Sequence, residues 1–167
     1  SQAHPARDEF YELLNRYKPV SSPGKHLNNT TMDVGERFAK DWMYSKIKFQ
    51  SKCKFTIAFE NTSASGYTTE KLLHAFNSQT IPIYWGNPDV TQDFNLKSFI
   101  NCHDYNSFEE VINRIKNIES DSNLYLSILN EPALKNNVIP TYLTKNKLLN
   151  FLEGIFESEN PYKRSSY

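Results

Sequence analysis

The chain has 167 residues, carries 19 Lys and Arg against 19 Asp and Glu, and is 14% aromatic. That length suits one compact domain and falls short of two, because single domains usually span about 100–200 residues. The zero formal charge excludes the strongly basic surface that nucleic-acid binders present to the phosphate backbone. A chain of this size buries roughly 70% of its unfolded surface, so it needs no disulfide or metal ion in order to fold.

Short sequence patterns exclude further classes. No run reaches the ~20 apolar residues of a membrane span, and the first residues lack the basic and then apolar pattern of a signal peptide. The chain starts with Ser1 and not with Met, so we expect it to be a processed, trimmed or cloned piece of a longer protein. The two cysteines, Cys53 and Cys102, are too few and too far apart for a zinc cluster. We expect both to be reduced and buried near strands, although a disulfide between them stays open.

The first third of the chain is predicted to be mostly helical. Apolar and aromatic side chains at helical spacing predict an amphipathic helix over residues 5–17. Gly, Pro and polar residues then predict a loop over 20–33. Residues 35–52 are expected to form one or two short helices that place their aromatic side chains in the core. These side chains are Phe38, Trp42 and Phe49.

The centre of the chain alternates between predicted strands and helices. β-branched and aromatic residues predict strands over 54–59 and 80–85, and the helix between them should begin at Thr68 or Thr69. Pro82 cannot donate a backbone hydrogen bond, so it favours an edge strand or a gap in the ladder over the middle of a sheet.

The last part of the chain continues this alternation. A short strand is predicted over 98–102, and Ser107 with Glu110 forms a capping-box pattern that opens a helix. Helices are also predicted over 123–130 and 145–157, and the second of these should bury its apolar side chains. Those side chains are Leu148, Leu149, Leu152, Ile155 and Phe156. The whole pattern predicts an α/β fold with a Rossmann-like parallel sheet and helices on both faces.

In such a fold, ligands bind where strands end and helices begin. Here residues 59–61, which include Glu60 and Asn61, close a strand, and residues 66–71 open the next helix. Free backbone N–H groups and the helix dipole favour an anion there. Lys71 lies in the first turn, where a cation opposes the dipole, and this placement makes sense if a phosphate lies between them. Glu70, when ionised, can accept bonds from two sugar hydroxyls.

A purely structural interpretation explains the same residues. Thr68 or Thr69 would then be a simple N-cap, Tyr67 a hydrophobic staple, Glu70 a partner of the dipole and Lys71 a solvated surface charge. The segment also lacks a glycine-rich phosphate-binding fingerprint. Local physical chemistry alone therefore leaves both interpretations open.

Four sequence blocks resemble the signature of the α-1,3/4-fucosyltransferases. They are Phe59-Glu60-Asn61, Tyr67-Thr68-Thr69-Glu70-Lys71, Ile81-Pro82-Ile83-Tyr84-Trp85-Gly86 and Lys97-Ser98-Phe99-Ile100-Asn101. They occur in the family's order and spacing, and the upstream helix around Arg7 matches as well. The resemblance extends over about residues 3–132 and is greatest to bacterial-type members.

The resemblance implies an inverting glycosyltransferase with two facing Rossmann-like domains (GT-B type). Residues 1–157 would form the C-terminal, GDP-fucose-binding domain, followed by a tail over 158–167, and the N-terminal acceptor domain would be absent from this chain. By matching position, Arg7 and Lys71 would hold the diphosphate and stabilise it as the leaving group. The residues expected to contact nucleotide, ribose or fucose are Asn61, Tyr67, Thr69 and Glu70.

The implied reaction is the attack of an acceptor-glycan hydroxyl on the anomeric carbon of L-fucose, with departure of GDP. Negative charge grows on the diphosphate, so fixed cations lower the barrier. No Asp-x-Asp motif is present to hold a metal ion, and we expect no metal or other cofactor. The general base is expected in the N-terminal domain, which leaves this chain inactive alone. The family also implies a cytoplasmic or inner-membrane-peripheral location.

Two other functions remain open: a non-catalytic module that binds GDP or a nucleotide sugar, and an interaction domain without a ligand. The aromatic residues of 35–52 would also suit a surface on which the N-terminal domain docks, and its exposure would favour self-association.

Three local candidates have simple structural explanations. Glu70 and His74 are spaced like a metal pair, but we expect a packing histidine. His103 and Asp104 could line the cleft or form a turn with Asp104 as its cap. Residues 24–25 could approach the nucleotide or form a solvated turn.

Overall fold

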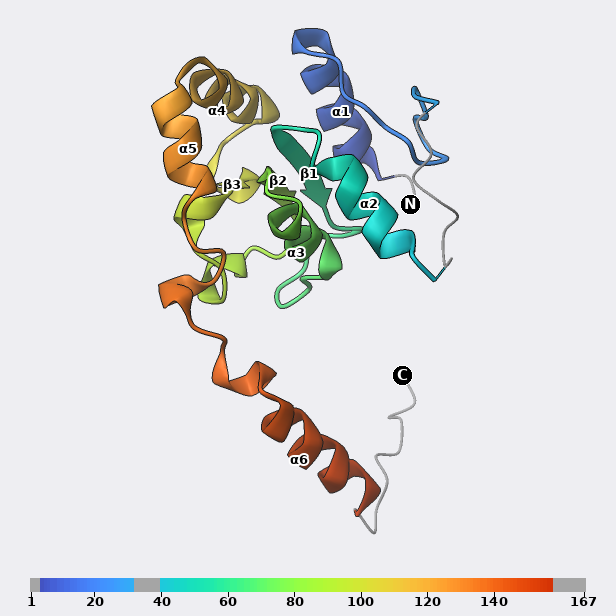
Figure 1. Ribbon diagram of the computed structural model, residues 1–167, viewed down its shortest axis with the longest axis vertical. Helices are drawn as coiled ribbons and strands as arrows, with labels where there is room; N and C mark the ends of the chain where they lie inside the picture. The colour runs from blue at the N-terminus through green and yellow to red at the C-terminus, as the bar shows by residue number, and fades with distance from the viewer. Residues whose placement is uncertain (1–3, 32–39, 158–167) are drawn as a thin grey trace.

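The computed structural model describes residues 4–31 and 40–157. A parallel three-stranded sheet in the order β1 (Phe55–Phe59), β2 (Ile81–Trp85) and β3 (Ile100–Asn101) forms the centre. The helices α1 (Pro5–Tyr17), α4 (Phe108–Ser120) and α5 (Ser122–Leu129) cover one face, and α3 (Glu70–Asn77) covers the other, with α2 (Trp42–Gln50) beside it (Figure 1). The predicted Rossmann-like arrangement is therefore confirmed.

Two apolar clusters explain why the helices lie on opposite faces. Alternate residues of a strand point to opposite sides of the sheet. Ile81 and Ile83 pack with the buried side chains of α1 and α4, whereas Ala58 and Tyr84 pack with Leu72 of α3. The sheet thus has an apolar layer on each side, as parallel sheets require.

The helix starts follow their capping residues. The N-cap of α1 is His4, whose imidazole accepts a bond from the backbone N–H of Ala6. Ser107 caps α4 by accepting from the N–H of Glu110 at 3.4 Å, as the capping-box pattern predicts. The Glu110 carboxylate, however, bonds the N–H of Asn106 at 3.0 Å instead of returning to Ser107.

The structure corrects the expectation that Pro82 avoids the middle of the sheet. β2 is the central strand, but Pro82 is only its second residue. The N–H of Ile81 donates to the carbonyl of Lys54, the residue before β1, so alternation turns the backbone of Pro82 toward β3. The ladder with β3 begins one residue later, at Ile83. Pro82 is therefore paired with Thr56 of β1 inside the central strand, one residue before the ladder with β3 begins.

The helix α6 (Lys145–Phe156) contradicts the prediction that it buries its apolar side chains. None of its residues is buried, and it projects away from the sheet (Figure 1). The segment that leads into α6 is joined to the rest of the structure by an antiparallel bridge between Phe94 and Leu134. A hydrogen bond between Tyr142 and Asp93 adds to this contact. Periodicity identifies the apolar face of a helix, but it does not determine what covers that face.

The aromatic side chains of the second helical segment are also less buried than expected. Trp42 and Phe49 of α2 are both half-buried, and no residue of α2 is fully buried. Phe38 lies outside the described residues. The large exposed apolar side chains gather instead between residues 138 and 156.

Candidate functional site

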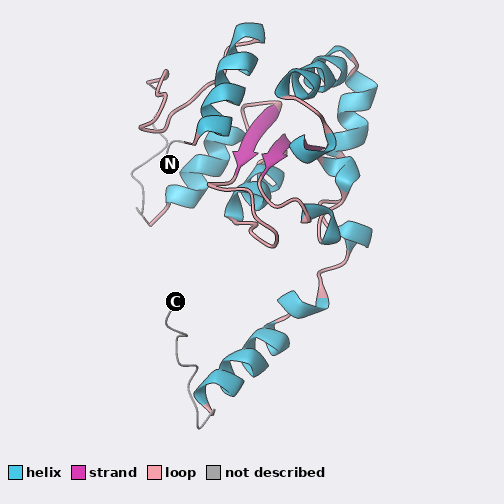
Figure 2. Ribbon diagram, turned by 180° about the vertical axis from the view of Figure 1, so that it is seen from behind, coloured by secondary structure: helices cyan, strands magenta, loops and turns pink. Residues whose placement is uncertain are grey.

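The candidate site lies at the carboxyl edge of the sheet, where β1 and β2 end level with each other. Phe59 is in register with Trp85, and both strands run in the same direction (Figure 2). The chain leaves β1 through Glu60 and Asn61 and enters α3 at Glu70, with Thr69 as the N-cap residue. The sequence thus brings the predicted residues to the edge at which this kind of fold binds ligands.

Glu60 is the centre of the hydrogen-bond network, and its side chain is fully buried. Its carboxylate accepts from the backbone N–H of Thr69 at 2.8 Å, from the Thr69 hydroxyl at 2.7 Å and from the Lys71 ammonium at 2.8 Å. A buried carboxylate is costly unless it is paired and hydrogen-bonded, and these three bonds meet that need.

Gly86, the residue after β2, makes room for this carboxylate. A Cβ atom at Gly86 would come 2.4 Å from Cγ and 2.7 Å from Cβ of Glu60, closer than real contacts allow. The glycine of the third sequence block therefore supports the glutamate of the first.

Lys71 is paired inside the network. Its side chain is 22% exposed, and its ammonium donates to Glu60 and, at 2.9 Å, to the Thr69 hydroxyl. The structural interpretation treated Lys71 as a solvated surface charge, and on this point it is wrong. The buried carboxylate of Glu60, in front of α3, explains why a cation lies in the first turn of that helix. The sequence pattern did not reveal this pairing.

Arg7 reaches the same place from the first turn of α1. Its Nη2 donates to the main-chain carbonyls of Phe59 and Glu60, both at 3.0 Å, and to Oδ1 of Asn61 at 3.2 Å. Burial lowers the pKa of Arg7, while Asp8 and Glu60 oppose that shift. Arg7 and Lys71 are 64 residues apart in sequence, yet both donate to Glu60. Arg7 bonds its main-chain carbonyl, and Lys71 bonds its carboxylate.

Glu70 is exposed at the start of α3. Burial pushes its pKa upward, but the hydrogen bond to its own backbone N–H and the charges of Lys71 and Lys46 outweigh this, so the pKa is lowered. Glu70 is therefore held as the ionised, acceptor-only form that sugar hydroxyls can approach.

The loop that carries Tyr67 is fixed by Asn87, a buried residue two positions after the end of β2. Its Oδ1 accepts from the N–H of Gly66 at 2.9 Å, and its Nδ2 donates to the Thr68 hydroxyl at 3.1 Å. Gly66 adopts a positive φ of 74°, which glycine tolerates best. Tyr67 itself is half-buried and Asn61 is exposed.

Sequence reasoning missed Glu60, Gly86 and Asn87 as individual site residues, although all three lie in or beside the quoted blocks. The available signal was an acidic residue placed directly after an apolar strand, since buried carboxylates rarely occur without a partner.

The other local candidates mostly follow their structural explanations. His74 is buried, contacts the ammonium of Lys46 at 3.1 Å and packs edge-on against Trp42, as expected of a packing histidine. No group of three metal-binding side chains occurs within residues 4–31 and 40–157. The turn at residues 24–25 is exposed.

His103 lies at the same edge of the sheet. Its Nε2 is 3.1 Å from the carbonyl of Gly86, and its ring stacks on Trp85. The cap of this turn is Asn101, which accepts from the N–H of His103, whereas Asp104 accepts from the amide of Asn101. The expected Asp cap is therefore wrong: Asn101 caps the turn, and Asp104 supports it only through Asn101.

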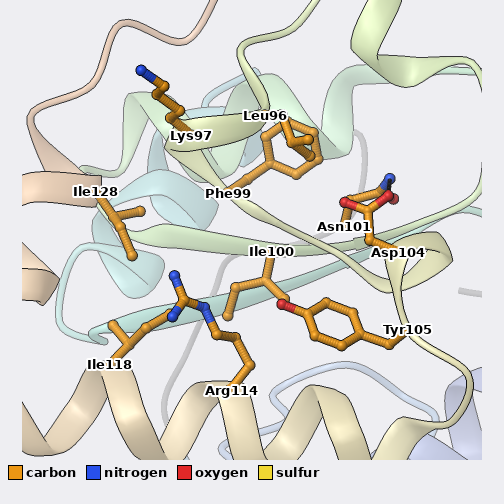
Figure 3. A pocket seen from close by; sticks show the side chains of 10 residues that line it. All are labelled: Leu96, Lys97, Phe99, Ile100, Asn101, Asp104, Tyr105, Arg114, Ile118 and Ile128. Atoms are coloured by element: carbon orange, nitrogen blue, oxygen red, sulfur yellow. Dashed lines mark hydrogen bonds between the residues drawn. The ribbon is translucent and has the colours of Figure 1, made fainter.

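A pocket of about 150 Å³ lies beside β3; Asp104 lines it, but none of the residues that the family resemblance assigns to the donor site does (Figure 3). Arg114 and Tyr105 point toward each other across it. The candidate site lies at the carboxyl edge of the sheet and is defined by its hydrogen bonds and charges.

Across the described part of the chain, no helix combines the length and apolarity that crossing a bilayer requires. Cys53 and Cys102 are both free thiols; Cys102 is buried as expected, and Cys53 is half-buried.

Comparison with known proteins places these observations in a family. Residues 1–131 match the model of the C-terminal part of glycosyltransferase family 10 (fucosyltransferase). The alpha-(1,3)-fucosyltransferase FucT of Helicobacter pylori is 40% identical over 162 residues, which are 95% of this chain and 32% of the relative. The human 4-galactosyl-N-acetylglucosaminide 3-alpha-L-fucosyltransferase 9 is 37% identical over 127 residues, 71% of this chain and 35% of the relative.

Solved structures agree with the sequence matches. An alpha1,3-fucosyltransferase crystallised with GDP-fucose superimposes with a TM-score of 0.84 at 38% identity, over 96% of this chain and 46% of the solved one. The same enzyme type with GDP gives a TM-score of 0.83. This chain thus spans less than half the length of these relatives, as one half of a GT-B fold would. It belongs to glycosyltransferase family 10, the fucosyltransferases, and corresponds to their C-terminal part.

Proposed function

We propose that this chain is the donor-binding part of an inverting fucosyltransferase, which transfers L-fucose from GDP-fucose to a hydroxyl of an acceptor glycan in α-1,3 or α-1,4 linkage. The observation that carries the proposal is the convergence of Arg7 and Lys71 on Glu60 at the carboxyl edge of the sheet. Two cations beside a helix N-terminus suit a diphosphate. The relatives crystallised with GDP-fucose and GDP support the same ligand.

The proposed roles follow from the charges. As the bond between fucose and diphosphate breaks, negative charge accumulates on GDP, and Arg7 and Lys71 stabilise that charge. Lys71 has three N–H donors and two acceptors among the described residues, which leaves one donor for a phosphate oxygen. Glu70 and Asn61 are exposed beside it and would accept from ribose or fucose hydroxyls.

GDP titration tests these roles. We expect Arg7→Ala and Lys71→Ala each to weaken GDP binding by about 1–3 kcal/mol, the value of a charged hydrogen bond. Calorimetry on the purified chain measures this effect, with Lys52→Ala, an exposed lysine outside the site, as the control. Unchanged affinity in both variants would refute the assignment.

The acceptor hydroxyl also needs a general base within hydrogen-bond reach. We propose that this base and the acceptor site belong to the part of the enzyme that the chain does not span. The isolated chain should then bind GDP-fucose and transfer fucose negligibly, and addition of an N-terminal part should restore transfer. A non-catalytic nucleotide-binding module would show no transfer even after that addition.

We propose further that donor binding needs no metal or other cofactor, because two cations and a helix N-terminus supply the positive charge. GDP affinity should therefore be the same with excess EDTA as with added Mg²⁺ or Mn²⁺. A rise of tenfold or more with either metal would contradict the proposal.

The proposed location is the cytoplasm or the periphery of the inner membrane, as the resemblance to bacterial-type members implies. Fractionation of the source cells, with immunodetection of the chain, tests it.

A further inference from the structure

We propose that Glu60 is a positioning residue for the donor site: its buried carboxylate holds the Lys71 ammonium and the start of α3 in the place where they meet the diphosphate. This inference rests on the proposed function. Glu60 lies behind the cations and need not touch the ligand. Its action would pass entirely through Lys71 and Thr69.

The geometry makes Glu60 the common anchor of both cations. Its main-chain carbonyl accepts from Arg7, and its carboxylate accepts from Lys71, at 3.0 and 2.8 Å. The Thr69 hydroxyl donates to the carboxylate and also accepts from Lys71, which closes a three-membered network. The long, flexible side chain of Lys71 is thereby confined to one position before any ligand arrives.

Burial makes this position compulsory. The Glu60 side chain is fully buried, and an unpaired carboxylate there would be strongly unfavourable. Its three donors all come from Thr69 and Lys71, at the entrance to α3. The two carboxylate oxygens receive these three hydrogen bonds because α3 begins at Glu70, which places Thr69 and Lys71 in front of them. Gly86 contributes from the next strand, because any Cβ there would displace Glu60.

The variant Glu60→Gln separates this role from packing, because it keeps the size of the side chain. The amide oxygen can still accept from the N–H of Thr69, but the amide NH₂ would face the donors of Thr69 and Lys71. We expect the Kd for GDP to rise about tenfold, the size of one charge-assisted hydrogen bond.

A double-mutant cycle shows whether the effect passes through Lys71. In a Lys71→Ala background, Glu60→Gln should change the GDP affinity less than about twofold, because the cation that Glu60 positions is gone and the amide oxygen of Gln can still accept from the N–H of Thr69. A residue that merely stabilises the fold would weaken binding by the same factor in both backgrounds. Glu110→Gln is the matched control, since that carboxylate also bonds a backbone N–H but lies away from the site.

A second measurement does not involve GDP. The rate at which an amine-reactive reagent labels Lys71, followed by mass spectrometry, should rise by up to roughly fivefold in Glu60→Gln, as the side chain is released from 22% exposure. Lys52 is exposed and serves as the internal reference. If Glu60→Gln fails to fold, Thr69→Val removes the bridging hydroxyl and should raise the same labelling rate.

The two measurements keep the proposals distinguishable. If the unmodified chain does not bind GDP, the proposed function fails, while the labelling still tests whether Glu60 positions Lys71. An unchanged labelling rate of Lys71 in the folded variant, or an equal loss of GDP affinity in both backgrounds, would overturn the role of Glu60.

Discussion

Lys71 shows how much a single residue depends on a distant partner. Its place in the first turn of a helix is unfavourable by local rules, and a bound phosphate was one explanation. The structure supplies another, a buried carboxylate eleven positions earlier in sequence. The two explanations are compatible, because Glu60 fixes Lys71 while leaving one of its donors for a ligand.

At the same scale, Gly86 should resist substitution. Gly86→Ala would press its methyl group against Glu60, and overpacking of this kind costs about 1–3 kcal/mol of stability. Gly24→Ala is the matched control, because the nearest atom to its Cβ lies 4.0 Å away in an exposed turn. Thermal or urea unfolding measures both, and equal midpoints would contradict the prediction.

The two thiols should differ in reactivity. Burial, with a smaller effect of Asp104, raises the pKa of Cys102, and burial also raises the pKa of the half-buried Cys53. A raised pKa leaves less of the reactive thiolate at pH 8. Alkylation at pH 8 should therefore modify Cys53 first and reach Cys102 only after unfolding. Rapid modification of Cys102 in the native chain would be inconsistent with this burial.

Among the elements, α4 and α6 have similar amphipathic sequences but different surroundings. In α4 the side chains of Val111, Ile112, Ile115 and Ile118 are buried against the sheet, whereas in α6 none is buried. A periodic apolar pattern predicts a helix in both cases, but only contact with another surface converts that pattern into stability.

Matched truncations in these two helices test the difference. Ile115→Ala removes a buried side chain and should destabilise the chain by about 2–5 kcal/mol. Leu152→Ala, in α6, should change the free energy of unfolding by less than about 0.5 kcal/mol, because its side chain is already exposed. Urea titration of both variants provides the comparison. A large loss in Leu152→Ala would mean that α6 is covered in solution.

For the whole molecule, the apolar side chains between residues 138 and 156 form the main apolar surface that is exposed to water. They include Val138, Ile139, Tyr142, Leu143, Leu148, Phe151 and Phe156. The sequence also suggested association, but through the aromatic residues of 35–52, of which Trp42 and Phe49 are half-buried. The surface that matters therefore lies on the projecting arm of the chain.

Self-association of the isolated chain should follow from this exposure. Light scattering at rising concentration should show oligomers, and Phe151→Glu together with Phe156→Glu should reduce them. The same exchange at two polar, exposed positions, Asn123→Glu and Ser127→Glu, serves as the control. A clean monomer at high concentration would argue against the prediction.

By itself, the sequence determined the order of strands and helices, the parallel sheet with helices on both faces, and the family blocks at the strand–helix junctions. The strands and helices depend on periodicity, caps and turns within a few residues, which a sequence displays directly, and the family blocks are recognised by their resemblance to known sequences. Only the tertiary structure decided that Arg7 and Lys71 meet on a buried Glu60, that Gly86 makes room for it, and that α6 remains uncovered. Those outcomes depend on burial and on contacts between positions up to 53 residues apart, which exist only once the chain has folded.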